Sequence, residues 1–489
     1  MKRAAQLVLM LSLLVAISAQ CAEIILVYPR TMGSEVFVYP NGLDSTFVLG
    51  RVEPPGSILR INGHEVVCTP RGAFLAWLPL CSAPDEKAWI LSLSEDRTEI
   101  ARVSFPYLFA ADLPKTATSD TFSAISFPRV IEVAAPNAHT RTAIGGSYHI
   151  FPDSGCPLVA LNHERDFYKF EIGGGLSGVI EDRFVTVMAS RSLPEAVLGN
   201  GKCTTDGKFT LCTFSLSRAV PWSASLSSDQ KSLNVMLFGT TAAIDRIRFD
   251  VADEFLTGIT WEQLPAGLAL SFLCKEPVAR GYAVTCAHGD LRVQMRQPLS
   301  ARPRSLRGKL IVLDPGHSGV SNGAIGPLGT REKDVNLRWA NLLADELRRR
   351  GAIVELTRSA DEDLDLYARI DFAKSRAADF FISLHCNALP DGVNPFVRHG
   401  TGTYYYQEAS RRAAEKLHRR LVNASGLQDD GLWDANLAVV RPTEFPAVLL
   451  EAAYLIYPLE EELLQTDEFL RRLSKGVARG LKDYFREEP

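Results

Sequence analysis

The sequence has no excess of basic residues. Its 53 lysines and arginines are outnumbered by 57 aspartates and glutamates, and the formal net charge is -4. Proteins that bind nucleic acid usually carry a basic surplus, so nucleic acid is not expected as a partner. Apolar residues make up 46% of the chain and charged residues 22%, as in ordinary folded soluble proteins. A length of 489 residues is too great for one core, so several domains are expected.

The apolar stretch at the N-terminus, residues 7–19, is too short to cross a bilayer. It follows Lys2 and Arg3 and leads into small residues, the order typical of a secretory signal peptide. We expect residues 1–22 to be such a peptide, and the protein to be exported to the periplasm or cell envelope. The segment around Cys21 also resembles a bacterial lipoprotein box, although Gln20 is a poor residue before the cysteine. A membrane is expected as a partner only if Cys21 carries lipid.

Cysteine is scarce, with nine residues in the whole chain. Beyond Cys21, several fall in close pairs within strand-rich stretches: Cys68 with Cys81, Cys203 with Cys212, and Cys274 with Cys286. In an oxidising compartment such pairs would close short loops as disulfides. The alternative is that they are buried free thiols, because cysteine packs like a small hydrophobic residue. Both alternatives stay open.

The first two thirds of the chain are rich in short, alternating apolar runs. Residues 23–105 show such runs between Pro, Gly and Asn-Gly turns, which predicts an all-β sandwich, and they resemble a bacterial immunoglobulin-like module. Residues 106–140 lack a clear period and are expected to be a linker. Residues 141–200 resemble a Src-homology-3-like barrel, and residues 203–300 resemble an AMIN-type β-sandwich. The sequence thus predicts three all-β modules.

From Lys309 the pattern changes to alternating strands and helices. Apolar, β-branched runs predict buried strands at 310–313, 353–356, 380–384 and 446–450. Helical periodicity and end signals predict helices from Thr330 to Gly351, Leu366 to Ala378, Ala409 to Val422 and Asp467 to Phe485. We therefore expect residues 308–489 to form an α/β domain, with a mixed or parallel sheet flanked by helices on both faces.

Three of these strands lead into residues that can bind a metal or transfer protons. His317 follows the first strand and its Asp-Pro-Gly turn, His385 ends the run FFISL, and Glu451 ends the run PAVLL. In open α/β sheets the ligands bind outside the carboxyl ends of the strands. Because the carboxyl ends of parallel strands share one edge, these three side chains are expected to lie together.

A fourth residue, Glu332, stands at the start of the first helix, which would return it to the same edge. Two imidazoles and one carboxylate are the ligands of a hydrolytic zinc site that leaves a fourth position for water. The spacing is unlike the helical HExxH motif, and each histidine taken singly would more often be an ordinary loop or core residue. The common placement of His317, Glu332 and His385 nevertheless predicts a site for one Zn2+ ion.

Glu451 is expected to have a different role. Amide hydrolysis needs a group that takes a proton from water and passes it to the leaving nitrogen. A carboxylate beside the metal that is not one of its ligands suits that task, and apolar neighbours would raise its pKa toward neutrality. An ordinary helix-capping glutamate is the alternative. Asn387 is a candidate for substrate binding. Cys386, next to His385 on an extended strand, should face the opposite side and pack in the core.

The blocks IVLDPGHSG, GAIGPLGTREKDVNL, VELTRSADEDLDLYARIDFA, FISLHCNA, GTGTYYYQ and PAVLLEAAYLIYPLEEELL resemble the zinc-dependent N-acetylmuramoyl-L-alanine amidases of bacterial cell walls. The resemblance extends from Lys309 to the C-terminus. It implies that His317, Glu332 and His385 bind zinc and that Glu451 is the catalytic carboxylate. It also implies hydrolysis of the amide that joins N-acetylmuramic acid to the L-alanine of the stem peptide, with peptidoglycan as the partner.

The chain departs from the family pattern at three places. Ser318 replaces a usual glycine, Cys386 replaces a usual alanine, and the stretch EAAY, which begins with the catalytic glutamate, replaces a glycine-bearing step. The interval between His385 and Glu451 leaves little room for a long autoinhibitory helix, so regulation is expected from the β modules or from an envelope activator protein. Two other functions remain open: a peptidoglycan-binding scaffold of weak activity, and a zinc peptidase that cuts within the stem peptide.

Overall fold

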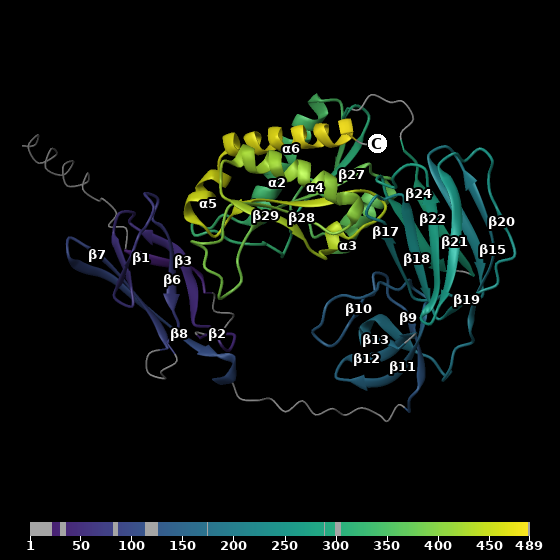
Figure 1. Cartoon of the computed structure of the whole chain (residues 1–489). Coiled ribbons are helices and arrows are strands. Elements are labelled where there is room, and N and C mark those ends of the chain that lie inside the picture. The colour runs from purple at the N-terminus through teal and green to yellow at the C-terminus, as the bar shows by residue number, and fades with distance from the viewer. Residues whose placement is uncertain are drawn as a thin grey trace, which may run out of the picture.

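The computed structural model describes residues 22–29, 36–81, 87–112, 126–173, 175–287, 289–298 and 305–487. The expected signal peptide and the candidate lipid site at Cys21 lie outside this part of the chain, except for Ala22. Across these ranges, no helix combines the length and the apolar character needed to cross a membrane. Figure 1 shows four parts, three built from strands and one, at the C-terminal end, from strands and helices.

The first part consists of two sheets, with strand orders β1-β3-β6 and β2-β8-β7-β4-β5. Trp89, Tyr39 and Tyr107 are buried in its core, where the indole Nε1 of Trp89 donates a hydrogen bond to the Tyr39 hydroxyl at 3.1 Å. Asn62 and Gly63, both at positive φ, form the turn between β4 and β5 that the Asn-Gly pair predicts. The strands are β1 (Glu23–Tyr28), β2 (Phe37–Tyr39), β3 (Ser45–Glu53), β4 (Ile58–Ile61), β5 (His64–Val66), β6 (Ala73–Pro79), β7 (Ala88–Glu95) and β8 (Thr98–Phe109).

The second part is a six-stranded sheet of order β10-β13-β12-β11-β9-β14 around the buried Phe170. The stretch expected to be a linker contributes structure at both ends, because β8 and a short helix η2 (Ala110–Asp112) extend into it and β9 lies inside it. The second part therefore begins earlier than the sequence predicts. Its elements are β9 (Arg129–Val133), β10 (Thr140–Arg141), β11 (Pro157–Glu164), β12 (Phe167–Gly173), β13 (Leu176–Glu181), η3 (Asp182–Phe184) and β14 (Val185–Val187).

The third part pairs a sheet of order β19-β15-β16-β24-β23, with β20 beside β15, against a second of order β17-β18-β22-β21. Its strands are β15 (Ala196–Thr205), β16 (Phe209–Leu216), β17 (Trp222–Leu226), β18 (Ser232–Phe238), β19 (Thr240–Ala242), β20 (Ile247–Arg248), β21 (Leu256–Leu264), β22 (Gly267–Cys274), β23 (Tyr282–Ala287) and β24 (Asp290–Arg296).

The eight cysteines among the described residues carry thiol groups and form no disulfide with one another. Cys203 and Cys212 are directly opposite each other on β15 and β16, so the two cysteines of this expected pair are neighbours in space. The thiol of Cys274 instead faces the sulfur of Met295 at 3.8 Å, and Cys286 accepts a hydrogen bond from the backbone N–H of Val220. The structure thus favours buried thiols over a disulfide for Cys274 and Cys286.

The C-terminal part is built on one mixed sheet of order β26-β25-β27-β30-β28-β29. β26, β25, β27 and β30 are parallel, β28 is antiparallel to β30, and β29 is parallel to β28. The elements are β25 (Leu310–Pro315), α2 (Glu332–Arg349), β26 (Ile353–Leu356), α3 (Leu366–Ser375), β27 (Phe380–Asn387), β28 (Thr401–Tyr405), α4 (Glu408–Ser425), β29 (Asp429–Asp434), η4 (Ala438–Val440), β30 (Ala447–Tyr454), α5 (Pro458–Leu464) and α6 (Asp467–Glu487).

Helices cover both faces of this sheet. One core joins α2, α4 and α6 to the sheet through residues such as Trp339, Leu417 and Leu481, and these three helices lie on one side in Figure 1. A smaller core on the other face joins α3 and η4 to residues such as Phe381 and Leu449. The expected α/β architecture is confirmed, and the shift of the α2 N-cap from Thr330 to Arg331 is within one residue.

Candidate metal centre

The register of the central strands brings the predicted residues to one edge of the sheet. Pro315 at the end of β25 pairs with Leu384 of β27, and His385 pairs with Glu451 of β30. His317 follows two residues after β25. The carboxyl ends of these three parallel strands therefore present His317, His385 and Glu451 at the same edge, as the sequence predicts.

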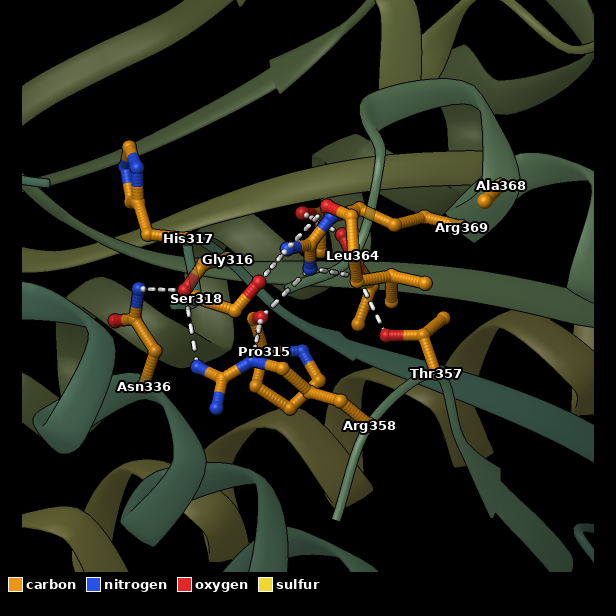
Figure 2. A network of polar contacts seen from close by, with 12 residues as sticks. Pro315, Gly316, His317, Ser318, Asn336, Thr357, Arg358, Leu364, Ala368 and Arg369 are labelled. Carbon is orange, nitrogen blue, oxygen red and sulfur yellow. Dashed lines mark hydrogen bonds and ion pairs between the residues drawn. The ribbon is translucent and has the colours of Figure 1, made fainter. Parts of the chain in front are cut away.

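His317 lies on a loop whose backbone is in the left-handed region, with φ of 58°. A non-glycine residue adopts this conformation only when its surroundings hold it there. The ring is oriented by Ser321, whose hydroxyl lies 3.0 Å from Nδ1. Two arginines, Arg358 and Arg369, both donate to the Pro315 carbonyl before His317, and Arg369 also donates to the Ser318 hydroxyl after it, as Figure 2 shows.

The first arginine, Arg358, binds only carbonyl groups. Its Nε donates to the carbonyl of Pro315 at 2.9 Å, and its Nη2 donates to the carbonyls of Gly316 at 3.2 Å and Lys333 at 2.8 Å. Asn336 of α2 donates a further hydrogen bond to the Gly316 carbonyl at 3.1 Å. Buried carbonyls are costly to leave unpaired, so these donors fix the turn before His317.

The second arginine, Arg369, pairs with the fully buried Asp314 at 2.8 Å. Asp314 also accepts hydrogen bonds from Thr357 at 2.6 Å and Ser383 at 2.8 Å. The other arm of Arg369 donates to the Ser318 hydroxyl at 3.0 Å. This buried network is fully paired, which makes it rigid, and it uses the serine that replaces the usual glycine.

Glu332 is the first residue of α2 and is almost completely buried. Its Oε2 accepts a hydrogen bond from the backbone N–H of Ala324 at 2.8 Å, and its Oε1 accepts bonds from the N–H of Cys386 at 3.2 Å and from Asn336 at 3.3 Å. Burial alone would raise the pKa of Glu332, but its contacts with His317 and His385 outweigh burial and place this pKa below the ordinary range. The carboxylate is therefore ionised, as a metal ligand must be.

Both imidazoles meet this one carboxylate. Nε2 of His317 lies 3.1 Å from Oε2 of Glu332, and Nδ1 of His385 lies 2.9 Å from Oε1. The ring centres of the two histidines are 5.1 Å apart, and one candidate ligand atom from each of the three residues lies within 4.8 Å of the others. Two imidazoles and a carboxylate at this separation fit a zinc ion with an open fourth position.

Glu451 lies beside the three residues and differs from them in its environment. It is buried, and its Oε2 has no hydrogen-bond partner among the described residues. Burial, and then the negative charge of Glu332, raise the pKa of Glu451 well above its ordinary value. An unpaired buried carboxylate oxygen is rare and calls for an explanation. A substrate or water that binds at this point would supply the missing partner.

The candidate substrate residue Asn387 lies at the end of β27, and its Nδ2 is also without a partner among the described residues. Tyr404 on β28 lies beside Asn387 and Glu451: burial and then the negative charge of Glu451 raise the pKa of Tyr404, and the contact with the Asn387 side chain partly offsets this rise. Cys386, in contrast, is 1% exposed and belongs to the core beneath α2, α4 and α6. Cys386 thus packs in the core as expected, and its Sγ donates a hydrogen bond to Oδ1 of Asn336 at 3.5 Å.

Gly316 is required by the close approach of a ring. A Cβ atom at this position would lie 2.2 Å from Cε1 of His385, far inside van der Waals contact. The turn before His317 can therefore pass over the imidazole of His385 only because residue 316 has no side chain.

The structure brings the four predicted residues together at one edge, but sequence reasoning did not identify the residues that orient them. Asn336 is one of these, and its position four residues after Glu332 would have placed it on the same helix face. Asp314 was interpreted only as part of a turn, and its role depends on the arginines that approach from separate segments. Arg358, which follows β26, and Arg369, on α3, are those arginines.

The comparison with known proteins agrees with this geometry. The sequence profile described as N-acetylmuramoyl-L-alanine amidase matches residues 311–483. The protein YqiI of Bacillus subtilis is 30% identical over 192 residues, which span 38% of this chain and 90% of YqiI. The chain belongs to the N-acetylmuramoyl-L-alanine amidase family. We call the part that carries the match, residues 308–489, the amidase domain.

Two further relatives match only part of this chain. The probable cell wall amidase LytH of Staphylococcus epidermidis is 34% identical over 200 residues, and the match covers 40% of this chain and 65% of LytH. Among solved structures, the catalytic domain of the N-acetylmuramoyl-L-alanine amidase CwlV from Bacillus (Paenibacillus) polymyxa is 35% identical, with a TM-score of 0.34. That match covers 36% of this chain and 97% of CwlV's catalytic domain. The chain thus spans less than two thirds of LytH.

Proposed function

We propose that the protein is a zinc-dependent amidase that hydrolyses the bond between N-acetylmuramic acid and L-alanine in peptidoglycan. The observation that carries this proposal is the arrangement at one sheet edge: three convergent ligands and a separate buried carboxylate with an unpaired oxygen. Membership of the family gives the substrate class, since its relatives include the N-acetylmuramoyl-L-alanine amidase LytC of Bacillus subtilis.

His317, Glu332 and His385 would hold the zinc ion, which supplies a Lewis acid when bound. Glu451 would take the proton from the attacking water and pass it to the nitrogen of L-alanine as the carbon–nitrogen bond breaks. Burial raises the pKa of Glu451, which makes the carboxylate a stronger base than an exposed glutamate. Asn387 would donate a hydrogen bond from its Nδ2 to the bound substrate.

The parts of the chain before residue 308 would serve binding and regulation. We propose that they are an immunoglobulin-like, a Src-homology-3-like and an AMIN-type module, in that order, with peptidoglycan or an envelope activator protein as their partner. Export to the periplasm or cell envelope follows from the expected signal peptide, and lipid on Cys21 would add a membrane anchor. These assignments rest on sequence resemblance together with the strand-rich sheets of the three parts.

The test is digestion of purified peptidoglycan by the full chain, read by mass spectrometry. Free stem peptides that begin with L-alanine, together with glycan that has lost its peptides, are the expected products. The products should disappear with a chelator and return with zinc. Cuts within the stem peptide would instead identify a zinc peptidase. No product from a folded, zinc-loaded chain would favour a binding scaffold.

A further inference from the structure

The first part of the fold, β1 to β8, is called the first β domain from here on. It packs against the amidase domain at the edge of the sheet that carries the metal centre. An apolar cluster joins the two domains and contains Phe47, Leu49, Leu75, Leu389, Tyr454 and Ile456, each at most 8% exposed. The last three of these follow directly on the site residues of β27 and β30. The strand ends that present His385 and Glu451 therefore run into this interface within a few residues.

A carboxylate of the amidase domain is held there by two hydroxyl groups of the first domain. The Tyr28 hydroxyl and the Thr46 Oγ1 both donate to Oδ1 of Asp391, at 2.6 and 2.7 Å. Thr46 is fully buried, and burial, followed by Asp391 itself, raises the pKa of Tyr28. The tyrosine therefore keeps its proton at neutral pH and remains a donor. Hydrogen bonds to a charged acceptor are among the stronger ones in proteins.

Asp391 lies on the loop that leaves the sheet after Asn387. The pairing of β27 with β30 is regular up to His385 and Glu451, and the register then shifts before Asn387. His385 and Glu451 are thus fixed by the sheet, whereas Asn387 lies where the regular pairing ends. Beyond the shift, Asn387 pairs with Tyr454, and its carbonyl accepts a hydrogen bond from the N–H of Leu455 at 2.9 Å. Because Tyr454 packs in the interface cluster, the position of Asn387 depends on residues that the first domain contacts.

The segment before the candidate ligand Glu332 also contacts the first β domain. Arg71 hydrogen-bonds to Oε1 of Gln465, and the same amide donates through Nε2 to the Thr330 hydroxyl at 2.6 Å. Thr330 lies shortly before Glu332. This contact is exposed at Arg71, so we expect it to matter less than the buried contacts of Asp391.

We infer that Tyr28 and Thr46 are positioning residues of the amidase. Through Asp391 they fix the loop after β27, and with it the side chain of Asn387 that faces the substrate. The first β domain is then a part of the substrate site rather than an independent module. This inference rests on the proposed function, and it separates substrate binding, which depends on the loop, from metal binding and proton transfer, which depend on the sheet.

The experiment compares the full chain with the variants Tyr28→Phe, Thr46→Val and the double variant. Removing both donors leaves Asp391 without its partners, so KM for soluble muropeptide should rise roughly tenfold. kcat and zinc content should stay unchanged, and hydrogen exchange of residues 388–393 should become faster. Thr98→Val makes the same chemical change on an exposed hairpin of the same domain and should alter none of these quantities.

A second comparison tests whether the effect passes through Asp391. In an Asp391→Ala background, adding the double variant should raise KM no further, because the two hydroxyls have lost their acceptor. An unchanged KM in an active double variant would overturn the inference, and so would a parallel loss of kcat and zinc. If the wild-type chain releases no stem peptide, the proposed function fails, and unchanged exchange of residues 388–393 would then overturn the inference by itself.

Discussion

The protein holds histidines beside carboxylates in two regions, and the two regions arrange them differently. In the second β domain, which is the part built from β9 to β14, His163 lies 2.8 Å from Asp182 and His139 lies 3.9 Å from Glu181. The amidase domain also holds single pairs, His399 with Glu460 and His418 with Asp429. It alone adds a second arrangement, in which His317 and His385 meet the same carboxylate, Glu332. Within the described ranges, only this second arrangement brings three candidate ligands within reach of one ion.

The packing around the rings explains the difference. The rings of His139 and His163 lie against aromatic side chains, with centres 4.9 Å from Tyr148 and 4.5 Å from Tyr168. Each histidine is enclosed by its own strand neighbours and pairs locally. His317 and His385 come from the ends of separate strands and face each other. Convergence from separate strands, rather than the presence of histidine and carboxylate, is what makes a metal site.

Removal of a shared ligand should have the largest effect. His385→Ala and Glu332→Gln each leave two protein ligands, so both variants should lose zinc and all release of stem peptides. Elemental analysis of the purified protein and mass spectrometry of digests measure the two losses. The matched variant His163→Ala should keep zinc and activity. Loss of zinc in that variant would break the comparison between the two regions.

Glu451→Gln should have the next largest effect. The amide keeps the shape of the side chain but cannot accept a proton, so kcat should fall by about 10²–10⁴-fold while zinc is retained. Initial rates on peptidoglycan measure the change, with the exposed Glu468→Gln as the control. A rate near that of the wild type would exclude Glu451 as the proton-transferring group.

Arg369→Lys should weaken metal binding without abolishing it. Lysine lacks the planar fork that reaches Asp314 and Ser318 together, so the loop that carries His317 should be held less firmly. Loss of such supporting contacts typically costs about 10–100-fold in metal affinity, measurable by competition with a chelating dye. Arg376→Lys, at the end of the same helix and paired with the partly exposed Glu355, should leave the affinity unchanged.

The smallest effect concerns the second β domain and pH. Burial lowers the pKa of His139 from its ordinary value near 6.5. The unfolded chain therefore binds more protons than the folded domain below this pH, and the free energy of unfolding should decrease as the pH falls from there toward the folded pKa. This free energy is measured by the hydrogen exchange of β10 and β13 in increasing denaturant at several pH values. His139→Gln should flatten the dependence, whereas the exposed His64→Gln should not.

Much of this site could be predicted because parallel strands put their carboxyl ends at one edge. The runs LIVL, FFISL and PAVLL identify the strands, and the residue after each run identifies its contribution. Glu332 needed one more step, the return of α2 to that edge. The same reasoning could not give the network around Asp314, since its partners Thr357, Arg369 and Ser383 belong to three different elements.

The β domains were less predictable in their boundaries and in which strands share a sheet. β9 was assigned to a linker because its five residues lie between stretches without a clear period. Cys274 and Cys286 are close in sequence but lie on β22 and β23, which belong to different sheets. In α3, the predicted end at Ala378 is too late because the helix ends at Ser375 and Ala377 adopts a φ of 52°.

The absence of a side chain at Gly316 suggests a way to recognise inactive members of the amidase family. A methyl group there would collide with the ring of His385, although it removes no ligand and no catalytic carboxylate. A relative could therefore retain all four polar residues and still be unable to assemble them. When genomes are surveyed for functional enzymes of this kind, the glycine before the first histidine should count as part of the diagnostic signature.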